Sequence, residues 1–174
     1  MLESCTPGSE IPTTDLYESS PALKILIELI QSPPSLPIKS RDRLPPTDRH
    51  GAPLYRTEYE RNSIIPLPLL REMLRLVDKY LLPPSTLSVL GEHLAAHAHE
   101  NPLDVYSLST LYTLADPASQ ASGYIGPLDT YDKETVVNSV KSVEAYHDLV
   151  SLQSFRTKEM KKVLLSEEIF PHGL

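Results

Sequence analysis

The sequence is short of the residues on which several classes of protein depend. Cys5 is the only cysteine among 174 residues, which excludes an internal disulfide and a cysteine-rich zinc module. Six glycines leave little material for phosphate-binding loops, and neither a Walker-type nor a dinucleotide-binding glycine motif is present. No apolar run approaches the roughly 20 residues that span a bilayer. We therefore expect no membrane association and a reducing location, cytoplasmic or nuclear.

Basic residues are also in deficit. Lys and Arg number 16 against 23 Asp and Glu, which gives a net charge of −7 and a pI near 5.3. Nucleic-acid binding needs a positive surface, so we expect no nucleic-acid partner. The N-terminal MLESCTPGSE has neither a basic nor an apolar segment of the secretory kind, and the sequence predicts no signal peptide.

What remains is typical of a globular, mainly α protein whose helices are separated by prolines. Apolar residues recur with helical spacing, and the pattern predicts a multi-helix orthogonal bundle. The segment 21–31 is apolar nearly all round, so we expect it to be buried on more than one side. The predicted helices cover 21–31, 68–82, 86–98, 101–115, 117–122, 133–140 and 142–155, with RTKEMKKVLL extending or following the last one.

Polar residues and prolines mark the ends of these helices. Pro83 and Pro84 are expected to end the helix 68–82. Predicted N-caps are Ser20, Ser85 or Thr86, Asn101, Asp116 and Ser142. The predicted inner stripe of the helix 142–155 consists of Val143, Tyr146, Leu149, Val150 and Phe155.

The chain divides into three parts by composition. Residues 1–20 are polar and are predicted to form a flexible tail; 21–99 form a helical region; 100–174 form a helical extension. A proline-rich, charged insertion occupies 33–68. Within it LYRTEYE (54–60) fits a short strand, while helix and coil stay open.

The stretch GEHLAAHAHE (91–100) carries the most specific chemical pattern. His93 and His97 stand four apart, which on a helix places them on one face, a geometry that zinc sites use. The glutamate of the metalloprotease motif H-E-x-x-H is missing, and no sequence feature places a third ligand among Glu100, Asp104, His50, His147 or His172. Metal binding by His93 and His97 is thus a minor hypothesis beside a structural role, in which His97 lies at the edge of the core and His93 borders the apolar face.

The sequence signals for a catalytic site are equally weak. No nucleophile elbow is present, and the carboxylate pairs Asp129 with Asp132 and Glu167 with Glu168 lie in polar contexts. The sequence predicts neither an enzyme nor a cofactor.

Four segments resemble BTB/POZ domain proteins of the fungal type. LLREMLRLVDKYLLPPSTLSVLGEHL is similar to the stretch in which a helix ending in "-DKY-" leads through a short turn into the next amphipathic helix. NPLDVYSLSTLYTLADPASQAS is similar to the continuation in which "P-L-x-V-Y" opens a helix, and EAYHDLVSLQSFRTKEMKKVL to the terminal helix. SPALKILIELIQSPP would correspond to the helix and proline-rich exit that end the earlier half of the fold. The resemblance covers 20–35 and 67–165.

The strand-rich first half of a BTB domain has no counterpart here, because only about 20 polar residues precede the first helix. The resemblance therefore implies a partial or degenerate BTB fold with a helical extension, acting as a non-enzymatic protein–protein interaction module. A cullin-dependent ubiquitin-ligase substrate adaptor is the alternative. The partner and the oligomeric state stay open.

Overall fold

The computed structural model describes residues 17–39, 59–140 and 142–165, and within them the chain is mainly α-helical, as predicted. The single bridge between strands in this part joins Lys39 to Tyr59, and the rest of the predicted strand, 54–58, lies outside it. No described helix is long and apolar enough to cross a membrane. The helices are α1 (Ser20–Gln31), α2 (Leu67–Lys79), α3 (Pro84–Ala96), α4 (Pro102–Leu111), α5 (Ala115–Tyr124), α6 (Lys133–Ser139) and α7 (Val143–Leu164), with 3₁₀ turns η1 (Arg61–Ser63) and η2 (Leu128–Thr130).

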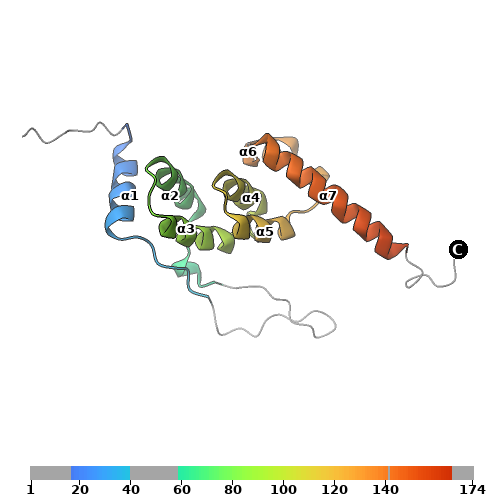
Figure 1. Ribbon diagram of the computed structural model, residues 1–174, viewed down its shortest axis with the longest axis horizontal. Helices are drawn as coiled ribbons and strands as arrows, with labels where there is room; N and C mark the ends of the chain where they lie inside the picture. The colour runs from blue at the N-terminus through green and yellow to red at the C-terminus, as the bar shows by residue number, and fades with distance from the viewer. Residues whose placement is uncertain (1–16, 40–58, 141, 166–174) are drawn as a thin grey trace, which may run out of the picture.

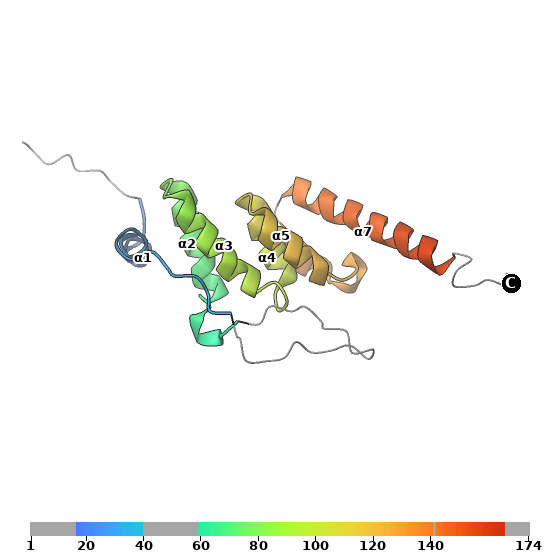
Figure 2. The same cartoon turned by 60° about the horizontal axis from the view of Figure 1, so that its bottom comes forward.

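The helices follow one another in a row in chain order, from α1 at one end to α7 at the other (Figures 1 and 2). α2 packs against α3 and α4 against α5, which forms two helical hairpins, and α3 packs against α5 to join them. α1 covers α2, and α6 contacts α4. The C-terminal half of α7 projects beyond the other helices (Figure 2).

Both hairpins turn in the same way. α2 and α4 are each followed by a residue in the left-handed region, Leu81 with φ 50° and Thr113 with φ 56°. In the turn after α2, the N–H of Leu82 donates to the carbonyl of Val77 at 3.0 Å, and an equivalent hydrogen bond closes the turn after α4. This is a Schellman motif, in which a left-handed residue satisfies the last carbonyls of a helix. A non-glycine residue costs more there than glycine does, so both turns depend on the packing around them.

The core runs through all the helices except the exposed half of α7. It is built from leucines and small apolar residues at helical spacing, and fully burying one leucine contributes roughly 1.5–3 kcal/mol. Leu70, Leu74, Leu76 and Val77 of α2 are buried. The side chains with no exposed surface include Leu70, Leu74, Leu76, Leu90, Leu94, Val105 and Leu149.

Several predicted helix ends were wrong by a few residues. α1 is capped by Ser19, whose hydroxyl accepts from the N–H of Ala22, and Ser20 is its first residue. α2 ends at Lys79, before Pro83, because the left-handed Leu81 already stops it. The second proline, Pro84, starts α3, since a helix tolerates proline in its first turn.

The predicted caps of α3 and α5 were also wrong, whereas Asn101 is the N-cap residue of α4, as predicted. α3 has no side-chain cap, and Thr86 is buried inside its first turn. Asn101 precedes α4 but its side chain makes no capping bond, and α5 begins at Ala115, so Asp116 lies in its first turn instead of at its N-cap. The cap of α7 was right, because Ser142 accepts from the N–H of Ala145. RTKEMKKVLL extends α7 as one continuous helix to Leu164.

Two predictions of burial failed, both at the ends of the row. α1 buries a single face, and Ile27 and Ile30 on its other side are exposed, because α2 is its main helical neighbour. On α7 only Leu149 of the predicted inner stripe is buried. The exposed members of that stripe are Val143, Tyr146, Val150 and Phe155.

Candidate functional site

The two histidines of the H-x-x-x-H pattern form hydrogen bonds with the backbone of one residue in the segment that precedes α2. Nδ1 of His93 accepts the N–H of Ile65 at 3.3 Å, and Nε2 of His97 lies 2.8 Å from the carbonyl oxygen of the same residue. A carbonyl only accepts, so His97 donates through Nε2. The helical spacing that could hold a metal here binds the N–H and the carbonyl group of one residue.

His93 also reaches the other end of the proline-rich insertion. Its Nε2 lies 2.8 Å from the carbonyl of Ser35, so the ring donates there while Nδ1 accepts, which assigns the Nε2–H tautomer. Ser63 Oγ accepts the N–H of Ile38 and Glu60 N–H donates to the Ile38 carbonyl, which closes the base of the insertion. α3 thereby fixes both ends of the segment.

The structure places His97 at the edge of the core, as expected, but buries His93 more deeply than expected. His93, expected to border the apolar face, is 2% exposed, whereas His97 is only partly buried. A buried polar ring must find partners for both nitrogens, and Ser35 and Ile65 supply them. No buried polar side-chain atom in the described ranges lacks a hydrogen-bond partner.

The metal hypothesis finds no third ligand near this pair. Within 17–39, 59–140 and 142–165 there is no group of three or more His, Cys, Asp or Glu side chains arranged to hold an ion. Asp104 pairs with Arg71 at 3.6 Å, and His147 is exposed on α7. His50 and His172 lie outside the described residues. A metal on His93 would have to displace one of its two hydrogen bonds.

The carboxylate pairs have structural surroundings. Asp132 caps α6 by accepting the N–H of Thr135 at 2.8 Å, and hydrogen bonds from the Thr135 hydroxyl and N–H lower its pKa. Asp129 is exposed in η2. Glu167 and Glu168 lie outside the described residues.

A charged cluster ties the start of α1 to α2. The carboxylate of Glu18, 6% exposed, accepts two hydrogen bonds from the Arg75 guanidinium at 3.1 and 2.6 Å and one from Lys79 Nζ at 2.5 Å. Hydrogen bonds from Arg75, then Lys79, lower the pKa of Glu18 to about 2. Arg75 also binds Glu72 one turn away at 3.0 and 2.6 Å. Glu18, within the predicted tail 1–20, is therefore held in place by Arg75 and Lys79. Residues 1–16 lie outside the described part of the chain.

α7 is held to the body mainly through its middle. The Gln153 amide accepts the N–H of Leu128 at 3.0 Å and donates to the carbonyl of Gly126 at 2.7 Å. Arg156 donates to the carbonyl of Ser122 at 2.8 Å. These bonds, with buried Leu149, attach α7 to the turn after α5. Nothing in the sequence distinguishes Gln153 or Arg156, because a polar residue within a helix carries no mark of its tertiary partner.

The apolar side chains left exposed gather on α7. Val143 is 79% exposed, Met160 62% and Leu164 50%. Together with Tyr146 and Val150, they occupy positions 143, 146, 150, 160 and 164, which fit the a and d positions of a heptad repeat. We call these five residues the α7 seam. Gln153 and Thr157 fill the two remaining positions of the series.

A groove of about 560 Å³ adjoins the first part of the seam. Its lining is mainly apolar, and its two charged residues are Asp129 and Lys133. We call it the α6–α7 groove; the residues that line it are chiefly Leu128, Tyr131, Val136, Val137, Val140, Val143 and Tyr146.

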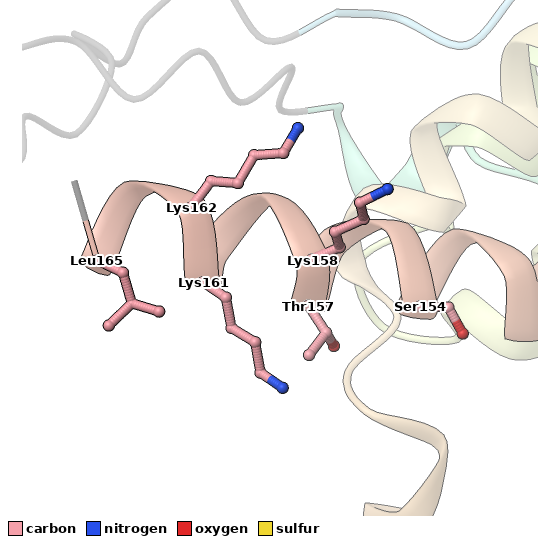
Figure 3. A pocket seen from close by; sticks show the side chains of 6 residues that line it. All are labelled: Ser154, Thr157, Lys158, Lys161, Lys162 and Leu165. Atoms are coloured by element: carbon pink, nitrogen blue, oxygen red, sulfur yellow. The ribbon is translucent and has the colours of Figure 1, made fainter.

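A second hollow, near the end of α7, is a helix surface and not an enclosed pocket. Five of the six residues that line it belong to α7, and the sixth, Leu165, follows its last residue. Figure 3 shows Lys158 and Lys162 pointing to one side of the helix, and Lys161 and Leu165 to the other. With a single wall it cannot enclose a small molecule. What it offers is a basic, partly apolar helix end.

Comparison of the chain with models of protein families, with curated proteins and with solved structures finds no match.

Proposed function

We propose that this protein is a non-enzymatic protein–protein interaction module, as its resemblance to the helical part of fungal BTB/POZ proteins implies. The observation that carries the proposal is the α7 seam, an apolar row at heptad spacing left exposed along a helix. Single exposed apolar residues are ordinary, whereas groups of them on one helix face, here Val143, Tyr146 and Val150 and then Met160 and Leu164, are typical of an interaction site.

The rest of the described surface favours binding over catalysis. His93 and His97 make hydrogen bonds to the backbone and Asp132 caps α6, and the α6–α7 groove is lined mainly by valines together with Leu128, Tyr131 and Tyr146. Aliphatic and tyrosine side chains with few charges are characteristic of the centre of protein interfaces.

The test compares partners captured by the whole protein and by a variant of the seam. Tyr146→Asp with Val150→Asp places two charges on an exposed surface and leaves buried Leu149 intact. Leu111→Asp, on exposed Leu111 of α4, is the matched control. We expect quantitative mass spectrometry to find proteins lost by the seam variant and retained by the control. If the same proteins are captured by all three chains, the seam is not an interaction site.

A defined probe separates this role from the alternative. The cullin-dependent adaptor role stays a prediction, and it requires direct binding of a cullin N-terminal domain. Titration of labelled protein with that domain, followed by fluorescence anisotropy, measures this. An unchanged signal at high micromolar concentration removes the adaptor role and leaves the interaction module in place. A cytoplasmic or nuclear location also stays a prediction, for cell fractionation to check.

A further inference from the structure

We propose that the projecting end of α7, residues 157–165, is a docking helix for an acidic partner protein that holds it in an apolar groove. The groove is of the kind that Ca²⁺ opens in sensor EF-hand proteins. The inference rests on the proposed interaction function and names the chemistry of one partner. It is carried by the exposure of this helix end, by its apolar side chains and by its charge.

The end of α7 extends past the body of the protein (Figures 1 and 2). Arg156, which donates to the carbonyl of Ser122 at 2.8 Å, is still partly buried. From Met160 to Leu165 every residue is exposed. Six consecutive residues make about one and a half turns of a helix, so every side of this end faces solvent.

Apolar side chains lie on more than one side of this exposed end. Met160 is 62% exposed, Leu164 50% and Leu165 80%. At about 100° per residue, Leu164 lies about 40° around the helix from Met160, whereas Leu165 lies about 140° from it. A helix that is apolar on several sides is normally buried on several sides. A flat surface would cover only one of them, so a groove that surrounds the helix is the better fit.

The charge of the helix end favours an acidic partner. The segment 156–165 has four basic residues and one acidic one, a net charge of +3, in a chain whose net charge is −7. Lys162 pairs with Glu159 one turn away. Lys158 and Lys161 point to different sides of the helix (Figure 3). Acidic residues along both rims of a groove would therefore be complementary to these lysines.

A basic helix with apolar anchors matches a known mode of recognition. In helix-in-groove binding the apolar residues of the helix enter a hydrophobic groove, and basic amphipathic helices are typical ligands of calmodulin. Sensor EF-hand proteins bind Ca²⁺ through carboxylates, and the bound ion opens a methionine-rich apolar groove. Flexible methionine side chains adapt to helices of different shape. We therefore expect Ca²⁺-dependent binding to the end of α7.

Isothermal titration of the whole chain with calmodulin, an acidic EF-hand protein used as the probe, tests the proposal. We expect binding in about 1 mM Ca²⁺, and an affinity at least about tenfold lower in excess EGTA, because the groove closes without Ca²⁺. Raising the salt concentration from about 0.05 to 0.5 M should weaken binding, because exposed charges are screened.

Two double variants locate the binding surface on the helix end. Met160→Glu with Leu164→Glu places charges on the apolar anchors, and Lys158→Glu with Lys161→Glu reverses the basic charge. Each should reduce the affinity for Ca²⁺-loaded calmodulin by at least about tenfold, since buried charge and like-charge contacts both oppose binding.

Matched controls place the same changes of charge on other exposed positions. Ile27→Glu with Leu111→Glu is the control for the apolar variant, and Lys24→Glu with Arg61→Glu is the control for charge reversal. Both controls should bind within about twofold of wild type. Circular dichroism should show that all four variants are folded, because surface substitutions change stability little.

Three results would overturn the proposal: no binding to calmodulin, equal affinity in Ca²⁺ and in EGTA, or binding that the two variants of the helix end leave unchanged. Vesicles of phosphatidylserine and phosphatidylcholine are a further comparison, and binding to vesicles without binding to calmodulin would also overturn it. A chain that does not bind calmodulin, yet loses captured proteins in the variant Tyr146→Asp with Val150→Asp, would end this inference and leave the proposed function standing.

Discussion

The carboxylate of Glu18 binds the guanidinium of Arg75 through two hydrogen bonds of 3.1 and 2.6 Å, across 57 positions of the sequence. Planar, two-bond pairing of this kind is stronger than a single ion contact. Lys79 and the hydroxyl of Tyr80 bind the same carboxylate. The residue before the cap of α1 is thereby joined to one face of α2.

This cluster predicts a loss of stability in acid. The hydrogen bonds from Arg75 and Lys79 lower the pKa of Glu18 from 4.5 to about 2 in the folded chain. A carboxylate whose pKa is lowered by folding stabilises the fold fully when the pH is above its pKa in the unfolded chain. That stabilisation is lost as the pH falls toward its pKa in the folded chain. The stability difference between wild type and Glu18→Gln should therefore be constant above about pH 5 and shrink between about pH 4.5 and 2.

Urea unfolding followed by circular dichroism at several pH values measures this. Glu28→Gln, at an exposed position on α1, is the control for removing a carboxylate from a nearby position of the chain. A difference that grows as the pH is lowered would contradict the role assigned to Glu18.

The hydrogen bonds of His93 and His97 predict unequal effects of two similar substitutions. His93→Ala leaves the N–H of Ile65 and the carbonyl of Ser35 without partners, and it should lower the free energy of unfolding by about 2–3 kcal/mol. His97→Ala removes one bond from a partly buried site, and it should cost about 1 kcal/mol. His147→Ala, at an exposed position, should change stability by less than about 0.5 kcal/mol. Equal losses of stability in His93→Ala and His97→Ala would contradict the roles assigned to these hydrogen bonds.

The hydrogen bonds of His93 also lead to a prediction about metal binding. Both ring nitrogens of His93 are engaged by the protein, so we expect protein purified without chelator or nickel resin to carry well below one equivalent of metal. Elemental analysis measures this. A full equivalent that is lost in His93→Ala and retained in His147→Ala would revive the hypothesis.

The attachment of α7 through Gln153 predicts a local change in dynamics. Gln153→Ala removes the bonds to Leu128 and Gly126, so hydrogen exchange should accelerate in α7 and in the turn it contacts. α2 and α3 should exchange as before. Gln120→Ala, at an exposed position on α5, should leave the whole pattern unchanged. Unchanged protection of α7 in the Gln153 variant would mean that its apolar contacts suffice.

The centre of the core predicts the largest losses of stability. Leu74 has no exposed surface, so Leu74→Ala should lower the free energy of unfolding by about 2–5 kcal/mol through lost burial and a cavity. Leu111→Ala, at an exposed leucine on α4, should cost less than about 0.5 kcal/mol. Chemical denaturation of both variants checks the contrast.

Helical periodicity alone determined that the protein is mainly α and roughly where each helix lies. Leu70, Leu74 and Val77 repeat at the spacing of one helix face, and a helix with such a face has to bury it. The exact helix ends were harder, because serine, threonine and proline fit several positions near a helix start. Ser19 and Ser20 are chemically identical, and only the backbone path decided which one caps α1.

Tertiary structure decided the roles of the polar residues and the fate of the apolar surfaces. His93 and His97 have the spacing of metal ligands, yet the path of the insertion brings the backbone of Ile65 between them. Val143 and Leu149 both have the sequence appearance of core residues; the position of α7 at the end of the row buries Leu149 and leaves Val143 exposed. Periodicity shows which residues share a face of a helix, but whether another helix covers that face depends on how the whole chain packs.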